Sequence, residues 1–235
     1  MTDPSPFDPH GKSKDRPHPS VRRPRLASSL ILTRARRSGP PEILFGRRSG
    51  DHVFMPRKYV FPGGRVDPTD GYAPLAGEPA PGVLDVMGRA LPPRRVRAAA
   101  AAAIRETAEE TGLLIARPGE IAPARDEWRP FAEAGLAPDA APLEVVARAI
   151  TPTGRPRRYD TWFFRADCEA VHGEMALNGS GELEDLRWVA LDEAHGLDIP
   201  IITRFVLAEL DAHLKGPAPV RCARVTRRGP EVKEV

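Results

Sequence analysis

Cysteine, aromatic residues and long apolar stretches are all scarce in this 235-residue sequence. The two cysteines, Cys168 and Cys222, are far apart in the chain, so neither a disulfide framework nor a zinc motif follows from them. No apolar run approaches the roughly 20 residues that a membrane helix requires, and the N-terminal residues lack the apolar segment of a signal peptide. We therefore expect a cytoplasmic protein with reduced thiols and no membrane span.

Acidic residues are few at both ends of the chain. The first 37 residues contain nine Lys or Arg and three Asp, and the last 20 contain five Lys or Arg and two Glu. Because the whole chain carries only +3, its centre is acidic. We interpret residues 1–24 as a disordered basic tail, residues 25–215 as one folded domain and residues 216–235 as a basic C-terminal tail. Basic tails can contact nucleic acid, but solvated tails are the simpler interpretation, so no nucleic-acid partner is expected.

The apolar pattern predicts an α/β or α+β sandwich, in which helices cover a mixed sheet. Strands are expected at residues 26–33, 42–48, 58–61, 113–116, 143–150, 157–166 and 183–190. Helices are expected at residues 94–111, 127–134 and about 199–215. Residues 68–92 are rich in Pro, Gly and Ala, which predicts a long inserted loop with a short helical turn near residues 83–87.

Three glutamates near the end of the 94–111 helix are the most informative residues. Glu106, Glu109 and Glu110 are three and four positions apart, so they share one helix face and repel one another. They also lie near the helix C-terminus, where the helix dipole disfavours anions. A bound hard cation, Mg²⁺ or Mn²⁺, would relieve both penalties. The alternative is a solvated acidic face that Arg105 partly balances.

The residues around these glutamates favour the metal site. The segment RETAEETGL at 105–113 and the upstream FPGG at 61–64 resemble the Nudix box, G-x5-E-x7-R-E-U-x-E-E-x-G-U, where U is aliphatic. The resemblance covers about residues 26–215. It implies a Nudix-type α/β/α sandwich and a metal-dependent hydrolase that cleaves diphosphate bonds.

Two features depart from the box. Gly64 and Arg105 are 41 positions apart, where the box places them 14 apart, and we attribute the difference to an inserted segment at about residues 68–92. The position eight residues before Arg105, where the box has a glutamate, is Arg97. Asp67 and Asp70 are the candidates to replace this glutamate. The second half of the box, which holds the main metal ligands, is intact, so we expect activity to survive.

The resemblance implies the following roles. The metal site consists of Glu106, Glu109 and Glu110 together with the backbone carbonyls of Gly63 and Gly64. Arg105 orients a glutamate through a charge-assisted hydrogen bond. The general base is expected outside the box, in the segment before the 183–190 strand. Of Glu182 and Glu184 we choose Glu182, with Glu174 as a weaker candidate and an exposed turn carboxylate as the alternative interpretation.

Substrate contacts are expected from basic residues near the glycines and before the aromatic strand. Arg65, Arg157, Arg158 and Tyr159 are the candidates, because arginine binds phosphate through two parallel hydrogen bonds. Solvated edge residues are the alternative for these arginines. The aromatic residues at 162–164 are interpreted as core rather than as a base-stacking platform.

The segments FMPRKYVFPGGRVD and TPTGRPRRYDTWFF, with the insertion between them, are similar to one branch of the Nudix family. That branch includes the peroxisomal and mitochondrial coenzyme A diphosphatases, which implies hydrolysis of CoA or acyl-CoA. ADP-ribose, nucleotide sugars and dinucleoside polyphosphates stay open as substrates, as does a homodimer. A non-catalytic Nudix-fold module that binds a ligand or RNA is the alternative class, and the three intact glutamates argue against it.

Overall fold

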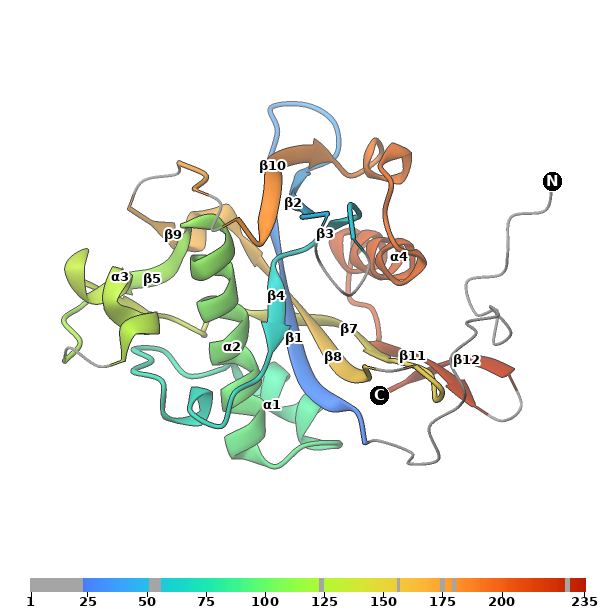
Figure 1. Cartoon of the computed structure of the whole chain (residues 1–235), viewed down its shortest axis with the longest axis horizontal. Coiled ribbons are helices and arrows are strands. Elements are labelled where there is room, and N and C mark those ends of the chain that lie inside the picture. Colours follow the sequence, from blue (N-terminus) through green and yellow to red (C-terminus); the bar gives the residue numbers. More distant parts are fainter. Residues whose placement is uncertain are drawn as a thin grey trace.

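The computed structural model describes residues 23–50, 56–122, 125–155, 157–173, 176–178, 181–226 and 229–235. It is a mixed α+β sandwich in which helices cover both faces of a large sheet (Figure 1). The fold class predicted from the sequence is therefore confirmed. The proposed N-terminal tail lies almost entirely outside the described residues.

The large sheet contains both parallel and antiparallel strands. Its strands are β1 (Arg25–Arg34), β2 (Glu42–Arg48), β3 (Tyr59–Val60), β4 (Gly63–Arg65), β7 (Glu144–Ile150), β8 (Tyr159–Asp167), β10 (Leu183–Ala190), β11 (Arg221–Thr226) and β12 (Gly229–Glu234). The spatial order is β10-β2-β1-β8-β7-β11-β12, with β3 paired to β2 and β4 paired to β1. A second, small sheet consists of β5 (Leu114–Pro118), β6 (Leu136–Pro138) and β9 (Val171–His172).

Two helices flank the large sheet. Helix α2 (Pro93–Thr111) packs on one face, and helix α4 (Ile201–Lys215) packs on the other (Figure 1). The shorter helices are α1 (Pro81–Gly88), α3 (Arg129–Glu133), η1 (Asp70–Tyr72), η2 (Asp126–Trp128), η3 (Cys168–Ala170) and η4 (Ala194–Gly196). Within the described ranges, no helix is long and apolar enough to cross a membrane.

Helix α2 begins and ends where its sequence directs. Pro93 opens it, at a position where a missing N–H costs nothing, and Gly112 ends it with a left-handed φ of 76°. The alanine run at 99–103 is fully buried between these ends. Because alanine side chains are small, the helix backbone can lie close to β1, which sets the height of the glutamates above the sheet.

Strand β1 changes partner along its length, and this change positions the site. Its C-terminal end pairs with β2 in an antiparallel hairpin, with Thr33 opposite Ile43. Its N-terminal half pairs with β4 instead, with Ser28 opposite Gly64. On its other side β1 runs parallel to β8. The glycines of β4 are thereby placed beside the C-terminal half of α2.

The inserted segment is more ordered than its composition suggests, because the short helical turn expected near residues 83–87 is a helix of eight residues within the loop. Residues 81–88 form helix α1, which begins at Pro81, a favourable first position. Val83, Met87 and Leu91 are buried in the core that α2 shares with the sheet. Val83 and Met87 lie one turn apart on α1, and Leu91 follows four positions later, beyond the end of the helix; the surrounding Pro and Gly obscured this spacing.

The C-terminal residues are part of the sheet, and the interpretation of residues 216–235 as a separate tail is wrong. Strand β11 runs parallel to β7, and β12 pairs antiparallel with β11. The composition misled because the basic residues that the structure describes in this segment form ion pairs. Arg221 contacts the buried Glu209 of α4 at 2.8 Å, and Arg224 contacts Glu231 across the strand pair at 2.8 Å.

Candidate active site

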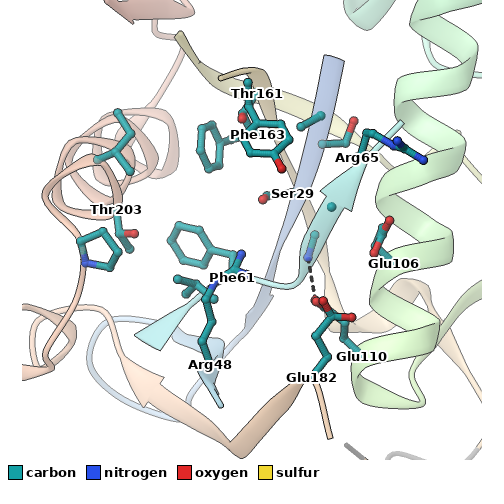
Figure 2. Close-up of a pocket in the computed structure, with 18 of the residues that line it drawn as sticks. Ser29, Arg48, Phe61, Arg65, Glu106, Glu110, Thr161, Phe163, Glu182 and Thr203 are labelled. Carbon is teal, nitrogen blue, oxygen red and sulfur yellow. Dashed lines mark hydrogen bonds between the residues drawn. The ribbon is translucent and has the colours of Figure 1, made fainter. Parts of the chain in front are cut away.

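A pocket of about 440 Å³ opens beside β4, between the end of α2 and the beginning of α4. Figure 2 shows carboxylates on its α2 side and mainly apolar side chains toward α4. The carboxylate side is formed by Glu106, Glu109, Glu110 and Glu182. The opposite side includes Val60, Phe61, Phe163, Pro200 and Ile202. The pocket thus suits a ligand that has both a charged and an apolar part.

Arg105 is the centre of the carboxylate side and is itself buried. Its Nη1 donates to Glu106 Oε1 at 2.9 Å and to Glu109 Oε2 at 3.1 Å. Its Nη2 donates to the backbone carbonyl of Arg65 at 3.2 Å, which ties α2 to the strand that carries the glycines. A single guanidinium therefore fixes two carboxylates and the adjacent backbone. These are the charge-assisted hydrogen bonds that the predicted orienting role of Arg105 requires.

Asp70 stands on the far side of the same guanidinium. It is 1% exposed, and its carboxylate accepts from Arg105 Nε at 2.9 Å and from Nη2 at 3.2 Å. The backbone N–H of Asp67 also donates to Asp70 Oδ2, at 2.7 Å, so this carboxylate accepts three hydrogen bonds. Of the two candidates for the missing box glutamate, Asp70 is therefore the one that contacts Arg105, whereas Asp67 pairs with the exposed Arg65.

The sequence identifies Asp70 if the spacing of the box is counted forward from Gly64 instead of backward from Arg105. Six positions after Gly64 the residue is Asp70, so the first half of the box reads G-x5-D and the insertion follows it. Counting backward from Arg105 leads instead to Arg97, whose side chain anchors the inserted segment through hydrogen bonds. Arg97 donates to Glu78 at 2.9 Å and to the carbonyls of Gly71 and Ala73 at 3.1 and 2.8 Å.

The two glycines leave room for the carboxylates. The N–H of Gly63 donates to Glu110 Oε2 at 2.8 Å, and its φ of 152° favours glycine. A Cβ on Gly64 would lie 2.4 Å from the carboxylate carbon of Glu106, so any side chain there would displace that carboxylate. The structure shows the N–H of Gly63 in contact with the box, and the role of the two carbonyls as metal ligands stays a prediction.

Burial gives the carboxylates high proton affinity. Burial raises the pKa of Glu110 from its ordinary 4.5 to about 8 and that of Glu106 to about 7. Repulsion between these two glutamates and from Glu182 adds to the effect, while Arg105 and the Gly63 N–H oppose it. Burial also raises the pKa of Glu109. Without a further cation, this side of the pocket holds more negative charge than its environment favours.

The donor set fits a hard divalent cation in chemistry and charge. Carboxylate oxygens are the ligands that Mg²⁺ and Mn²⁺ prefer, and a cation would offset the repulsion that raises both pKa values. Among the described residues, however, no three Asp, Glu, His or Cys side chains converge into a ready cage. The reason is that Arg105 holds Glu106 and Glu109 while Gly63 holds Glu110. The fit therefore rests on donor chemistry rather than on a preformed coordination sphere.

The other predicted site residues are only partly brought together. Arg65, Arg157, Tyr159 and Glu182 line the pocket. Arg158 does not; its Nε donates to the carbonyls at positions 151 and 152, in the turn between β7 and β8. The weaker base candidate, at position 174, lies outside the described residues.

Several pocket residues were not expected from the sequence. Arg48 extends from β2 into the pocket and lies close enough to Glu110 to stabilise its charged form (Figure 2). Trp162 and Phe164 are fully buried in the core, as interpreted, but Phe163 faces the other way and lines the pocket. Because successive side chains of a strand point to opposite faces, the sequence could have predicted that Phe163 faces away from Trp162 and Phe164.

Replacing Asp70 by Asn tests whether this residue anchors Arg105. Asp70→Asn leaves a buried guanidinium without its main counter-charge, so the free energy of unfolding is expected to fall by about 3–5 kcal/mol. Asp67→Asn is the matched control, because the Asp67–Arg65 pair is half-exposed and such pairs contribute about 1 kcal/mol or less. Urea denaturation of both variants checks this, and equal losses would contradict the anchoring role.

The raised pKa of Glu110 predicts a pH dependence of stability in the presence of EDTA. Because the pKa is higher in the folded protein, about 8 against 4.5, the folded state binds this proton more tightly than the unfolded chain. The contribution of Glu110 to the free energy of unfolding should therefore be largest below pH 4.5 and disappear as the pH rises to about 8. Comparing the wild type with Glu110→Gln by urea denaturation between pH 5 and pH 9 isolates this contribution, and parallel pH profiles would refute it.

Comparison with known proteins leads to one family. Residues 95–207 match the family model of the NUDIX domain. The chain is 31% identical to the acyl-coenzyme A diphosphatase NUDT19 of Gallus gallus, and the match covers 75% of this chain and 64% of the length of that protein.

Solved structures agree with the family model. The fold is similar to that of a NUDIX hydrolase from Alicyclobacillus acidocaldarius, with 28% identity, a TM-score of 0.60 and coverage of 82% of this chain and 93% of the other. The MutT protein from Methanosarcina mazei Go1 shares the fold at 16% identity and a TM-score of 0.50, over 83% of this chain and 99% of the other. Together with the contacts of the box residues to Arg105, these matches identify residues 95–207 as a NUDIX domain.

Proposed function

We propose that this chain is a metal-dependent hydrolase that cleaves the diphosphate linkage of a nucleotide derivative, with CoA or acyl-CoA as the leading substrate. The observation that carries the proposal is the group of box glutamates around Arg105, which forms one side of a pocket large enough for a substrate. The 31% identity to an acyl-coenzyme A diphosphatase supports the choice of CoA.

In this proposal Glu106, Glu109 and Glu110 hold Mg²⁺ or Mn²⁺, with the carbonyls of Gly63 and Gly64 as further ligands. When bound, such an ion supplies charge neutralisation for the diphosphate and lowers the pKa of the attacking water. Arg105 keeps Glu106 and Glu109 oriented toward the pocket through the hydrogen bonds described above.

The remaining polar residues of the pocket bind and orient the substrate. Arg48, near Glu110, and Arg65, beside the glycines, contact the diphosphate oxygens, and Arg157 binds a phosphate at the entrance. Glu182 accepts the proton of the attacking water, because it reaches the pocket from a segment outside α2 and lies near enough to the box glutamates to raise the pKa of Glu106 and Glu110.

The apolar side of the pocket receives the less polar part of the substrate. Phe61 and Phe163 pack edge to face with ring centroids 6.5 Å apart and expose only a small part of each ring. Pro200 and Ile202 bring the beginning of α4 to the same side. A pantetheine arm or a nucleobase would bury apolar surface here while the diphosphate lies against the carboxylates.

Product analysis tests the proposal. The purified protein is incubated with CoA, acetyl-CoA, ADP-ribose and NADH in the presence of Mg²⁺ or Mn²⁺, and the products are separated by chromatography. We expect metal-dependent cleavage of CoA and acetyl-CoA at the diphosphate, lost in a Glu109→Gln/Glu110→Gln variant. Preference for ADP-ribose would move the substrate to nucleotide sugars. If a folded protein cleaved none of these or of a wider nucleotide panel, the hydrolase proposal would fail in favour of a non-catalytic binding module.

The role of Glu182 has its own test. Glu182→Gln removes the proton acceptor but leaves the metal ligands in place, so kcat is expected to fall by about 10²- to 10⁴-fold with little change in KM. Glu184→Gln is the matched control, since Glu184 is two positions further along, exposed and 3.6 Å from Arg47. Similar small effects of both substitutions on kcat would remove Glu182 from the mechanism.

A further inference from the structure

A buried hydroxyl on β1 has no hydrogen-bond partner in the described part of the chain. Ser28 is 0% exposed, and its Oγ is neither donor nor acceptor to any described residue. An unsatisfied buried hydroxyl costs roughly 1–3 kcal/mol, and most buried polar atoms in proteins avoid this cost by binding protein or water. The position of Ser28 therefore requires an explanation.

The register of the sheet places this hydroxyl beside a catalytic carboxylate. Ser28 is the cross-strand partner of Gly64, so the two positions share one face of the sheet. Paired Cβ positions lie about 4.5–5.5 Å apart, and the carboxylate carbon of Glu106 lies 2.4 Å from where a Cβ on Gly64 would be. The hydroxyl of Ser28 and the carboxylate of Glu106 are therefore near neighbours, within reach of one bridging water.

The strand beside Ser28 carries a second unpaired polar group. Trp162 is its partner on β8 in the parallel register, and both side chains belong to the α2 face of the sheet. The indole Nε1 of Trp162 is also buried without a partner among the described residues. Buried waters occur where two to four polar groups can bind them; Ser28 and Glu106 are two such groups, and Trp162 carries a further unpaired donor on the same face of the sheet.

We propose that Ser28 is a positioning residue of the active site, whose hydroxyl, together with the indole N–H of Trp162, binds an internal water that donates a hydrogen bond to Glu106. Arg105 holds the other side of this carboxylate at 2.9 Å. The two contacts fix the plane of the carboxylate, so that its remaining lone pairs are directed into the pocket. The inference rests on the proposed function, because it assigns Glu106 to the metal site.

Ser28→Ala separates this role from a structural one. Removing an unpaired hydroxyl should leave the melting temperature unchanged or slightly higher. We expect kcat for acetyl-CoA to fall by about fivefold, the effect of one net hydrogen bond, with KM unchanged. The dissociation constant for Mn²⁺, measured by electron paramagnetic resonance without substrate, should rise by a similar factor.

Thr33→Val is the matched control on the same strand. The Thr33 hydroxyl is also buried, but it donates to the carbonyl of Ala166 at 3.4 Å and does not line the pocket. Its loss should lower the melting temperature and leave kcat and Mn²⁺ affinity unchanged. Ser28→Ala is therefore expected to change kcat and Mn²⁺ affinity without lowering the melting temperature, and Thr33→Val is expected to do the reverse.

Three results would overturn the proposal. Wild-type kcat and wild-type Mn²⁺ affinity in Ser28→Ala would show that the hydroxyl does not support Glu106. A loss of stability in Ser28→Ala like that in Thr33→Val would make its role structural, and a wild type that binds no Mn²⁺ would leave nothing for Ser28 to position. If the wild type binds Mn²⁺ but cleaves no substrate, the proposed function fails separately, and the Mn²⁺ comparison still decides on Ser28.

Discussion

The buried guanidinium of Arg105 is the interaction on which the site depends. Burial alone would lower its pKa, but the hydrogen bonds that it donates to Asp70 and the charges of Glu106 and Glu109 outweigh burial and raise it. One positive charge thus faces three carboxylates, so the cluster retains excess negative charge next to the pocket. Buried ion pairs contribute little net stability on average. The benefit here is orientation, because the planar fork of arginine fixes several carboxylates at once.

The inserted segment lengthens the box without separating its parts. The inserted residues 71–92 begin directly after Asp70, which ends the first half of the box, and stop at the start of α2. Arg97 fastens this segment through Glu78 and two backbone carbonyls, and α1 buries Val83 and Met87 in the core. Because the cost of closing a loop grows slowly with its length, a long insertion between fixed ends is tolerable. The two ends meet at the pair of Asp70 and Arg105, 2.9 Å apart.

The elements that the sequence predicted well are those with strong local signals. Helix α2 has an initiating proline, an alanine run and a terminal glycine, and it was expected at 94–111 and found at Pro93–Thr111. The glutamate face followed from helical spacing alone. Strand β4, in contrast, is three residues of Gly-Gly-Arg, and its pairing with β1 depends on tertiary contacts rather than on propensity. Arg48 and Ser28 could not be assigned to the site for the same reason, since only the split pairing of β1 brings them to the pocket.

The central claim is that the pair formed by Asp70 and Arg105 fixes the orientation of the box carboxylates that are proposed to bind the metal. A double-mutant cycle on Mn²⁺ affinity tests it most directly, using Asp70→Asn, Arg105→Gln and the combined variant. If the two residues act as one unit, each single substitution weakens Mn²⁺ binding, and the combined variant binds no more weakly than the worse single variant. Losses that simply add, or unchanged affinity in Asp70→Asn, would contradict the account.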